Sequence, residues 1–289
     1  MSQLKKVFVH DTKPVSSGAV LTFNIPSFDT IDDLLLRFTN SGAASTKAAI
    51  TAAIGKIALN INGEQVINCN ISELYDVFEM LGNQVQETAL VNVLSLNLAR
   101  LMFKMNTNKD FFAWGCDNVQ TIQLQVYCQS SVTGVTDLEV STERRSFKSA
   151  LSSVIKIINY PQSMAAAGIS SVDTLPRDSN DGYLAILANT GTAGVISAGE
   201  CVVNGNTIID PTAKAVMDYV CQARGFKPLP AYFNYLFADG SGRGALPMTG
   251  VTELRLKTTF TTAPTSGTYD LLAISIKNMP QSMLTAIAA

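Results

Sequence analysis

The feature that most constrains the fold is an ordered internal repeat. In the first half, Asn62-Gly63 follows an alternating strand pattern, and a helical pattern over Ile71–Leu81 comes soon after it. In the second half, Asn204-Gly205 has the same setting, and the helical pattern after it ends before Gly225. Asn-Gly between two apolar stretches is a strong signal for a tight hairpin turn. Asn204 lies 142 residues after Asn62 (204 minus 62), about half the chain of 289 residues.

Further elements keep the same order in both halves, and three pairs correspond. They are Leu101–Met105 with Tyr232–Phe237, Val119–Tyr127 with Val251–Phe260, and Val135–Val140 with Tyr269–Ile276. Loop lengths differ between the halves, whereas the element order does not. A repeat of several elements in one order indicates duplication of a whole domain.

The periodicity within these elements is mostly that of strands. Thr121–Val126 alternates apolar and polar residues, and residues 18–25 and Ile31–Phe38 are further short strands bounded by turn residues. About eight strands and one inserted helix per half predict an all-β protein of two tandem eight-stranded jelly rolls. A short Ala-rich helix is a candidate at Thr46–Ile54, and residues 83–100 are ambiguous between helix and strand.

We place the two domains at residues 1–150 and 151–289, with the boundary in the Ser-rich step Ser149–Ser153. We expect coil tails at residues 1–15 and 278–289. Neither a signal peptide nor a membrane-spanning apolar run is visible, which predicts a soluble protein made inside the cell. Five cysteines without paired spacing predict free thiols rather than disulfides or a zinc ribbon.

The charge pattern argues against extensive nucleic-acid binding. The net charge is −2, and the longest basic runs are the pairs Lys5-Lys6 and Arg144-Arg145, which we interpret as solvated surface. With 47% apolar and only 15% charged residues, the chain suits a subunit that loses exterior to neighbours, because interface cores are depleted in charge.

Catalytic groups are scarce in the sequence. His10 is the only histidine, and we interpret it as an exposed tail residue; it leaves no histidine-rich metal site and no base for a nucleophile. Asp32-Asp33 is a carboxylate pair, but neighbours on a strand point to opposite faces. The loop Asp239–Gly244 lacks the spacing of a phosphate or EF-hand loop. We therefore expect no enzyme activity, no cofactor and no assigned metal site.

Two terminal segments are candidates for contacts outside the domain. Lys5 and Lys6 could face the interior of an assembly or anionic lipid headgroups, although two charges attract such a surface only weakly. The apolar segment Met279–Ala289 is either a strap on its own domain or a contact with a neighbouring subunit or a membrane.

The two jelly rolls, each with Asn-Gly before a mid-domain helix, resemble the major coat proteins of icosahedral viruses with an internal membrane. The corticovirus type is most similar, and tectiviruses and adenovirus hexon are more distant. The local similarity lies in Arg144-Arg145-Ser-Phe147-Lys148, in Asp173-Thr-Leu175-Pro176-Arg177 and in the Tyr183-led strand that follows.

The resemblance implies a homotrimer whose six jelly rolls form a pseudo-hexagonal tile over a lipid bilayer. It also implies penton and minor capsid proteins as partners, and a virion assembled in the host cytoplasm. The alternative is a carbohydrate- or host-receptor-binding β-sandwich protein of a phage spike or fibre. A glycosidase built from distant carboxylates comes third.

Overall fold

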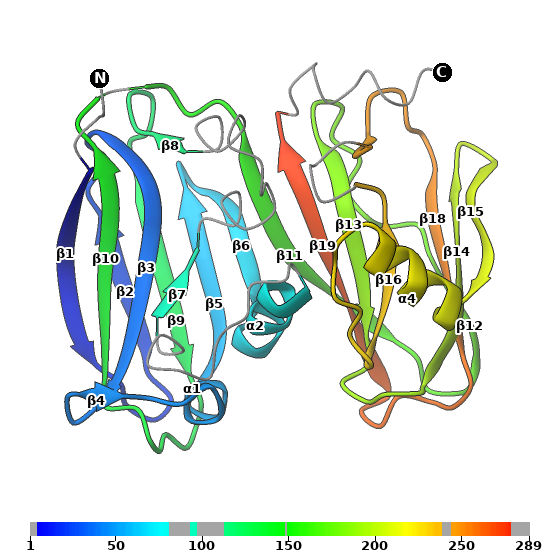
Figure 1. Ribbon diagram of the computed structural model, residues 1–289, viewed down its shortest axis with the longest axis horizontal. Helices are drawn as coiled ribbons and strands as arrows, with labels where there is room; N and C mark the ends of the chain where they lie inside the picture. Colours follow the sequence, from blue (N-terminus) through cyan, green and yellow to red (C-terminus); the bar gives the residue numbers. More distant parts are fainter. Residues whose placement is uncertain (1–4, 81–92, 97–112, 148, 239–243, 279–289) are drawn as a thin grey trace. The chain divides into compact units, whose positions relative to one another are not determined.

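The computed structural model describes residues 5–80, 93–96, 113–147, 149–238 and 244–278 (Figure 1). The chain divides into two compact units. The first contains residues 1–79 and 83–155, and the second contains residues 80–82 and 156–289. Within the described residues, no helix has the length and apolar character needed to cross a membrane.

The first unit is built from two antiparallel sheets. One has the order β1-β10-β3-β4, with the short strands β7 and β8 also paired to β3. The other has the order β6-β5-β9-β2. The strands are β1 (Lys5–Pro14), β2 (Val20–Ile25), β3 (Thr30–Asn40), β4 (Ala43–Ala44), β5 (Ile54–Ile61), β6 (Glu64–Asn70), β7 (Val93–Ser95), β8 (Trp114–Gly115), β9 (Ile122–Cys128) and β10 (Asp137–Arg145).

The second unit repeats this arrangement. One set of strands has the order β16-β13-β19-β11, with β17 also paired to β13, and the other has the order β12-β18-β14-β15. The strands are β11 (Val154–Ser163), β12 (Gly168–Val172), β13 (Gly182–Asn189), β14 (Ile196–Val203), β15 (Asn206–Ala213), β16 (Tyr232–Leu236), β17 (Leu246–Pro247), β18 (Leu254–Phe260) and β19 (Thr268–Lys277).

The strand order identifies the fold of each unit. If the two-residue strands β4, β8 and β17 are left aside, the described residues of each unit form eight strands in chain order. In both units the first strand pairs with the eighth, the eighth with the third and the third with the sixth. The second, seventh, fourth and fifth strands form the other sheet in that order. This is the jelly roll, and the prediction of two tandem eight-stranded jelly rolls is confirmed.

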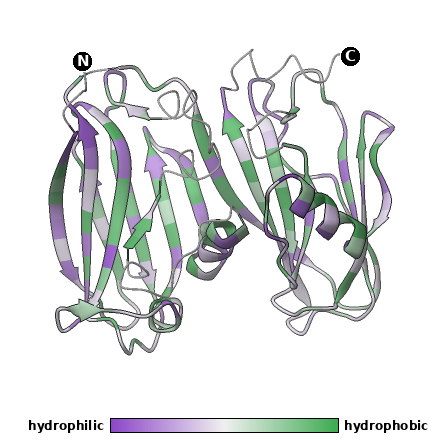
Figure 2. Cartoon of the chain, in the orientation of Figure 1, coloured by the Kyte–Doolittle hydropathy of each residue, from purple (hydrophilic) through white to green (hydrophobic). Residues whose placement is uncertain are grey.

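Alternation along the strands places the core between the two sheets of each unit. In β9, Ile122, Leu124 and Val126 are almost fully buried, whereas Gln123 and Gln125 between them are half-buried. The alternation of apolar and polar residues along such strands is visible in Figure 2. Period-two patterning is what a strand with one face on a core requires, so the sequence pattern identified this strand correctly.

Three helices are described. In the first unit α1 (Lys47–Ala53) is capped by Thr46, whose Oγ1 accepts from Ala49 N at 3.2 Å. In the same unit α2 (Ile71–Met80) has a hydrogen bond at its start, in which Glu73 Oε2 accepts from Asn70 N at 2.9 Å. In the second unit α4 (Lys214–Ala223) also follows the fifth strand of its jelly roll. The expected inserted helices are therefore present, and α1 confirms the short Ala-rich helix predicted at Thr46–Ile54.

The first Asn-Gly corner joins β5 to β6. Asn62 has φ 51° and Gly63 has φ 78°, the two positive values that a type I′ hairpin turn requires. The Asn62 side chain also fastens the segment before β9. Its Oδ1 accepts from Gln120 N at 2.7 Å and from Thr121 N at 3.2 Å, and its Nδ2 donates to Asn118 O at 3.1 Å.

The second corner, between β14 and β15, repeats these contacts atom for atom. Asn204 has φ 49° and Gly205 has φ 78°. Asn204 Oδ1 accepts from Thr252 N at 2.8 Å and from Glu253 N at 3.1 Å, and its Nδ2 donates to Gly250 O at 3.0 Å. The duplicated motif therefore has one structural task in both domains, which is to hold the hairpin against the start of the seventh strand.

The N-terminal part departs from expectation. The coil tail predicted for residues 1–15 is wrong from Lys5 onward, because Lys5–Pro14 forms β1 and pairs with β10 along its length. The strand was missed because polar residues interrupt its apolar alternation, and its partner lies more than 120 residues away. The compact units divide between Ile155 and Lys156, inside β11; the domain boundary at 150/151 stays a prediction.

Candidate functional site

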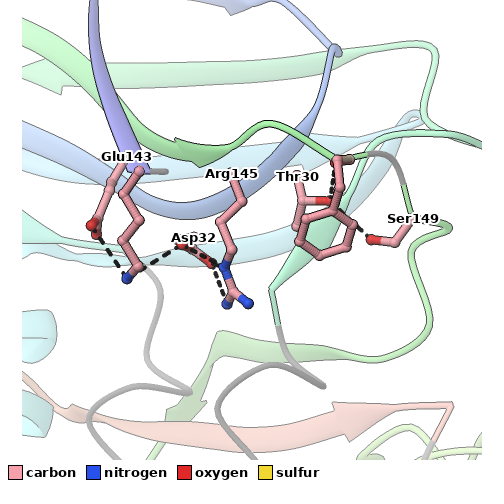
Figure 3. Close-up of polar contacts among 7 residues, drawn as sticks. Thr30, Asp32, Glu143, Arg145 and Ser149 are labelled. Atoms are coloured by element: carbon pink, nitrogen blue, oxygen red, sulfur yellow. Dashed lines mark hydrogen bonds and ion pairs between the residues drawn. The ribbon is translucent and has the colours of Figure 1, made fainter. Parts of the chain in front are cut away.

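A cluster of charged side chains lies where β1, β3 and β10 meet, and Figure 3 labels Asp32, Glu143 and Arg145 in it. The predicted residue Lys5 belongs to this cluster. At its centre the Asp32 side chain is fully buried. Arg145 Nε donates to Asp32 Oδ1 at 2.6 Å and to Oδ2 at 2.8 Å, and Arg145 Nη2 lies 2.5 Å from Oδ1. Lys5 Nζ completes the cluster, 3.4 Å from Asp32 Oδ2 and 3.3 Å from Glu143 Oε1.

A register irregularity places these charges together. Glu143 pairs with Asp33, whereas the next residue of β10, Arg144, pairs with Ile31, so that Asp32 is the extra residue of β3. An extra residue in one strand re-aims the side chains around it. An ion pair with almost no access to water, between Arg145 of β10 and Asp32 of β3, therefore joins these two neighbouring strands.

Arg144 is buried as well, but its partners are neutral. Its guanidinium donates to Phe28 O, to Pro26 O at 2.6 Å and to Thr142 Oγ1 at 2.8 Å. The Phe28 ring lies under it, with 4.0 Å between Cζ and the ring centroid. Burial lowers the pKa of Arg144 from its ordinary value. The interpretation of Arg144-Arg145 as solvated surface is wrong, because Arg144 is 1% and Arg145 9% exposed.

His10 also differs from its sequence interpretation. It lies on β1, half-buried rather than exposed in a tail, and its Nε2 is 2.7 Å from Thr142 Oγ1. Burial is the main cause that lowers the pKa of His10 from 6.5, and the nearby Arg144 charge lowers it further. A neutral imidazole in a hydrogen bond to a hydroxyl is a packing contact of the sheet.

The segment that follows β10 is hydrogen-bonded to other parts of the first unit. Thr30 Oγ1 donates to Phe147 O at 2.9 Å. It also lies 3.0 Å from Ser149 Oγ, and both Thr30 and Ser149 are labelled in Figure 3. Beyond it, Leu151 N donates to Asn118 Oδ1 at 2.7 Å. This Ser-rich step was predicted as the link between domains. Through Thr30 it is tied to the sheet that carries the charge cluster, and through Asn118 to the segment before β9.

The second candidate lysine, Lys6, is exposed and lies opposite Arg144 in the β1–β10 register. The structure therefore brings Lys5 into the ion cluster and leaves Lys6 at the surface. The Asp32-Asp33 pair is engaged in protein contacts, since Ser95 Oγ donates to Asp33 Oδ1 at 2.5 Å. Across the described ranges, no three His, Cys, Asp or Glu side chains are grouped to hold a metal ion.

The sequence interpretation missed Arg144 and Arg145 as buried groups. Their only signal was that they continue the strand pattern of β10 rather than follow its end. Two predicted segments, 239–243 of the Gly-rich loop and 279–289 at the C-terminus, lie outside the described residues, as does Leu101–Met105. All five cysteines are free.

Comparison with protein families decides the identity of this double jelly roll. The model of the viral coat protein P2 N-terminal domain matches residues 9–143, and that of the P2 C-terminal domain matches residues 154–279. The chain belongs to the viral coat protein P2 family. As a member, it is a viral coat protein, and the resemblance to double jelly-roll coat proteins is confirmed. No sequence among curated proteins matches it.

Solved structures share the fold over the full length of this coat protein. The major capsid protein P2 of bacteriophage PM2 is 16% identical with a TM-score of 0.77, and the match covers 97% of this chain and 100% of that one. The STIV major capsid protein is 12% identical with a TM-score of 0.67, covering 98% and 100%. The PBCV-1 capsid protein is 11% identical with a TM-score of 0.66, covering 94% of each. Nothing in these comparisons supports the sugar- or receptor-binding alternative.

Residues of the resemblance contribute local structure in the second unit. Leu175 is buried, and Arg177 Nη1 donates to Asp173 O at 3.1 Å. Tyr183, the second residue of β13, donates from its hydroxyl to Pro176 O at 2.7 Å. The Leu-Pro-Arg turn is thereby fastened to the strand that follows it.

Proposed function

We propose that this coat protein assembles as a homotrimer whose six jelly rolls form a pseudo-hexagonal tile of an icosahedral shell. The observation that carries the proposal is the duplication itself. Both units have one strand order and one Asn-centred corner, so three chains supply six similar domains. Such a tile has six nearly equivalent sides and can pack against six neighbours, while closed symmetry limits the size of each oligomer.

The test is the mass of the purified full chain by light scattering at micromolar concentration, followed by electron microscopy of particles. A trimer and a closed shell of pseudo-hexagonal tiles are expected. A monodisperse monomer at the same concentration would contradict the proposal.

The shell we propose encloses a lipid membrane, and Lys5 and Lys6 at the start of β1 face the interior. Lys6 is the better candidate for lipid contact, because it is exposed while Lys5 lies within ion-pair distance of Asp32 and Glu143. One lysine near an anionic surface contributes about 1 kcal/mol, or about fivefold in affinity.

This contact is tested by flotation of the protein with vesicles that contain anionic lipid. Lys6→Gln should weaken binding about fivefold. Lys257→Gln, which removes a lysine that is paired with Glu200 in the second unit, is the matched control and should bind as the parent does. Equal binding of the parent and Lys6→Gln would refute the lipid role of Lys6.

Further partners follow from shell geometry. A pseudo-hexagonal tile does not fit a fivefold vertex, so we propose a penton protein there and minor capsid proteins between tiles. We also propose that the chain is made in the host cytoplasm, binds no nucleic acid extensively and has no enzyme activity. Support comes from its net charge of −2 and from Asp32, Asp33 and His10, which are engaged in contacts within the first unit.

A further inference from the structure

The two Asn-Gly corners are the sites of the chain where a side-chain amide is most easily lost. In an Asn-Gly step the glycine nitrogen can attack the asparagine Cγ, because glycine has no side chain to obstruct the attack. The new C–N bond closes a succinimide ring, and ammonia leaves. Water then opens the ring to aspartate or isoaspartate. Asn62-Gly63 and Asn204-Gly205 are the only Asn-Gly steps in the sequence, and all four residues are exposed.

The side chain of each corner asparagine is held by three hydrogen bonds. Its Oδ1 accepts from two backbone nitrogens and its Nδ2 donates to one backbone oxygen, at 2.7–3.2 Å over the two corners. Nδ2 is the group that leaves as ammonia, so the reaction breaks the bond that it donates. The bonds to Oδ1 fix the orientation of the amide, and a rotation that aims Cγ at a new partner breaks them. The folded corner therefore opposes the loss of the amide.

The backbone of the corner also opposes the attack. Ring closure requires the glycine nitrogen to eclipse Cβ of the asparagine, which means a ψ of about −120°, the value at the first central residue of a type II′ turn. Both corners are type I′ turns, with positive φ at the asparagine and at the glycine. Such a turn has a ψ of about 30° at its first central residue, so the nitrogen lies on the far side of the Cα–C bond from Cβ. Attack therefore requires the corner to open and its peptide to rotate.

A carboxylate restrains the second corner further. Gly205 N donates to Glu253 Oε2 at 3.1 Å, and Arg255 Nη2 lies 3.4 Å from the other oxygen, Oε1. The attacking nitrogen must leave this bond and lose its proton, and a negative charge beside it disfavours that loss. The first corner has Thr121 in the place of Glu253, since each donates its backbone nitrogen to the corner asparagine. Thr121 cannot supply such a charge, so the two corners differ in this restraint.

We propose that Asn62 is a site of spontaneous deamidation in the folded coat protein, and that Glu253 protects the equivalent Asn204. Asn62 reacts when its turn opens, whereas at Asn204 the glycine nitrogen must also leave the carboxylate. The acid formed at position 62 no longer donates to Asn118 O, so the modified corner is held by fewer bonds. The reaction needs water and no partner chain, and it is therefore independent of the proposed trimer.

Peptide mapping by mass spectrometry tests this order in the full-length protein kept at neutral pH. The acid product should accumulate about fivefold faster at Asn62 than at Asn204, which is the effect of one net hydrogen bond. In urea, where the chain is unfolded, the two sites should react at similar rates. Both should react at least about tenfold faster there than in the folded protein, because three side-chain bonds no longer hold each amide.

Substitution of Glu253 isolates its contribution. Glu253→Ala removes the bond and the charge and should raise the rate at Asn204 about fivefold, while the rate at Asn62 stays unchanged as an internal reference. Glu253→Gln keeps an acceptor and removes the charge, so its rate at Asn204 should lie between those of the parent and Glu253→Ala. The matched control is Glu200→Ala, which removes another paired carboxylate of the same unit and should leave both rates unchanged.

Each contrary result has a separate meaning. Equal rates at the two corners of the folded parent, or equal acceleration of Asn204 by Glu200→Ala and Glu253→Ala, would overturn the protection by Glu253. A slower reaction of Asn204 in Glu253→Gln would show that the carboxylate acts as a base instead, and would overturn it too. Folded rates as high as those in urea would overturn the protection by the turn. An unmodified Asn62 after many half-lives of the unfolded chain would overturn the site itself.

Discussion

The Asn62 corner permits a substitution that separates its side-chain bonds from its backbone conformation. Asn62→Gly keeps the positive φ of 51° accessible but removes the bonds to Gln120 N, Thr121 N and Asn118 O. Each such bond contributes about 0.5–1.5 kcal/mol net. Because the corner is exposed, we take the low end of this range and expect a loss of about 1.5 kcal/mol from three bonds.

Asn62→Asp is the matched partial substitution. It keeps the oxygen that accepts from Gln120 N and Thr121 N and removes the donor to Asn118 O. The expected loss is about 0.5–1 kcal/mol, the value of one exposed bond. The ratio of the two losses therefore measures how the stabilisation divides between acceptor and donor.

Trp114 makes the first domain visible in the assay. It is the chain's single tryptophan, it is 3% exposed, and it lies in the first unit. The melting temperature, followed by its fluorescence at one fixed protein concentration, should fall by about 3–6 °C for Asn62→Gly. A shift below 1 °C would refute the reasoning. Asn204→Gly should perturb the second domain by a similar amount, because the same three backbone contacts recur there.

Three further predictions concern buried groups. Asp32→Asn leaves the Arg145 guanidinium beside a neutral amide in a buried site and should lower the free energy of unfolding in urea by about 3–5 kcal/mol. A loss under 1 kcal/mol would show that Asp32 and Arg145 are not each other's main partners. The pKa of His10 lies below 6.5, so the unfolded chain binds that proton more readily and stability should fall as pH drops through 6.5. His10→Gln should flatten this fall between about pH 7 and pH 5, and an unchanged pH profile of the melting temperature would contradict it. Cys128 is half-buried, whereas burial raises the pKa of the Cys201 thiol to about 12. Mass spectrometry after iodoacetamide treatment of the native protein should therefore find Cys128 alkylated first and Cys201 alkylated only after unfolding. Early labelling of Cys201 would contradict its burial.

The sequence predicted those parts of the fold that depend on local pattern. The Asn-Gly corners were readable because a type I′ turn needs positive φ at two successive residues, and few residue pairs other than Asn-Gly accept that cheaply. Strands such as β9 were readable because one buried face imposes a period of two. The ordered repeat then predicted the duplication of the domain, because element order can be compared without knowing which strands pair.

Long-range pairing was not readable in the same way. The extended conformation of Lys5–Pro14 is stabilised by β10, more than 120 residues later, and nothing in its own polar composition requires it. The same holds for Arg144 and Arg145. A charged pair in a sequence is solvated by default, and only an extra residue in β3 provides the buried carboxylate that receives one of them.

The sequence alone thus determined two duplicated all-β domains, their corners and their inserted helices, because turn chemistry and alternation act between residues close in the chain. Only the tertiary structure decided which charges are buried, that His10 belongs to a sheet, and that α4 exposes Val216 and Tyr219. Burial depends on contacts between segments that are distant in the chain. The same local sequence pattern can therefore lie against protein in one place and against water in another.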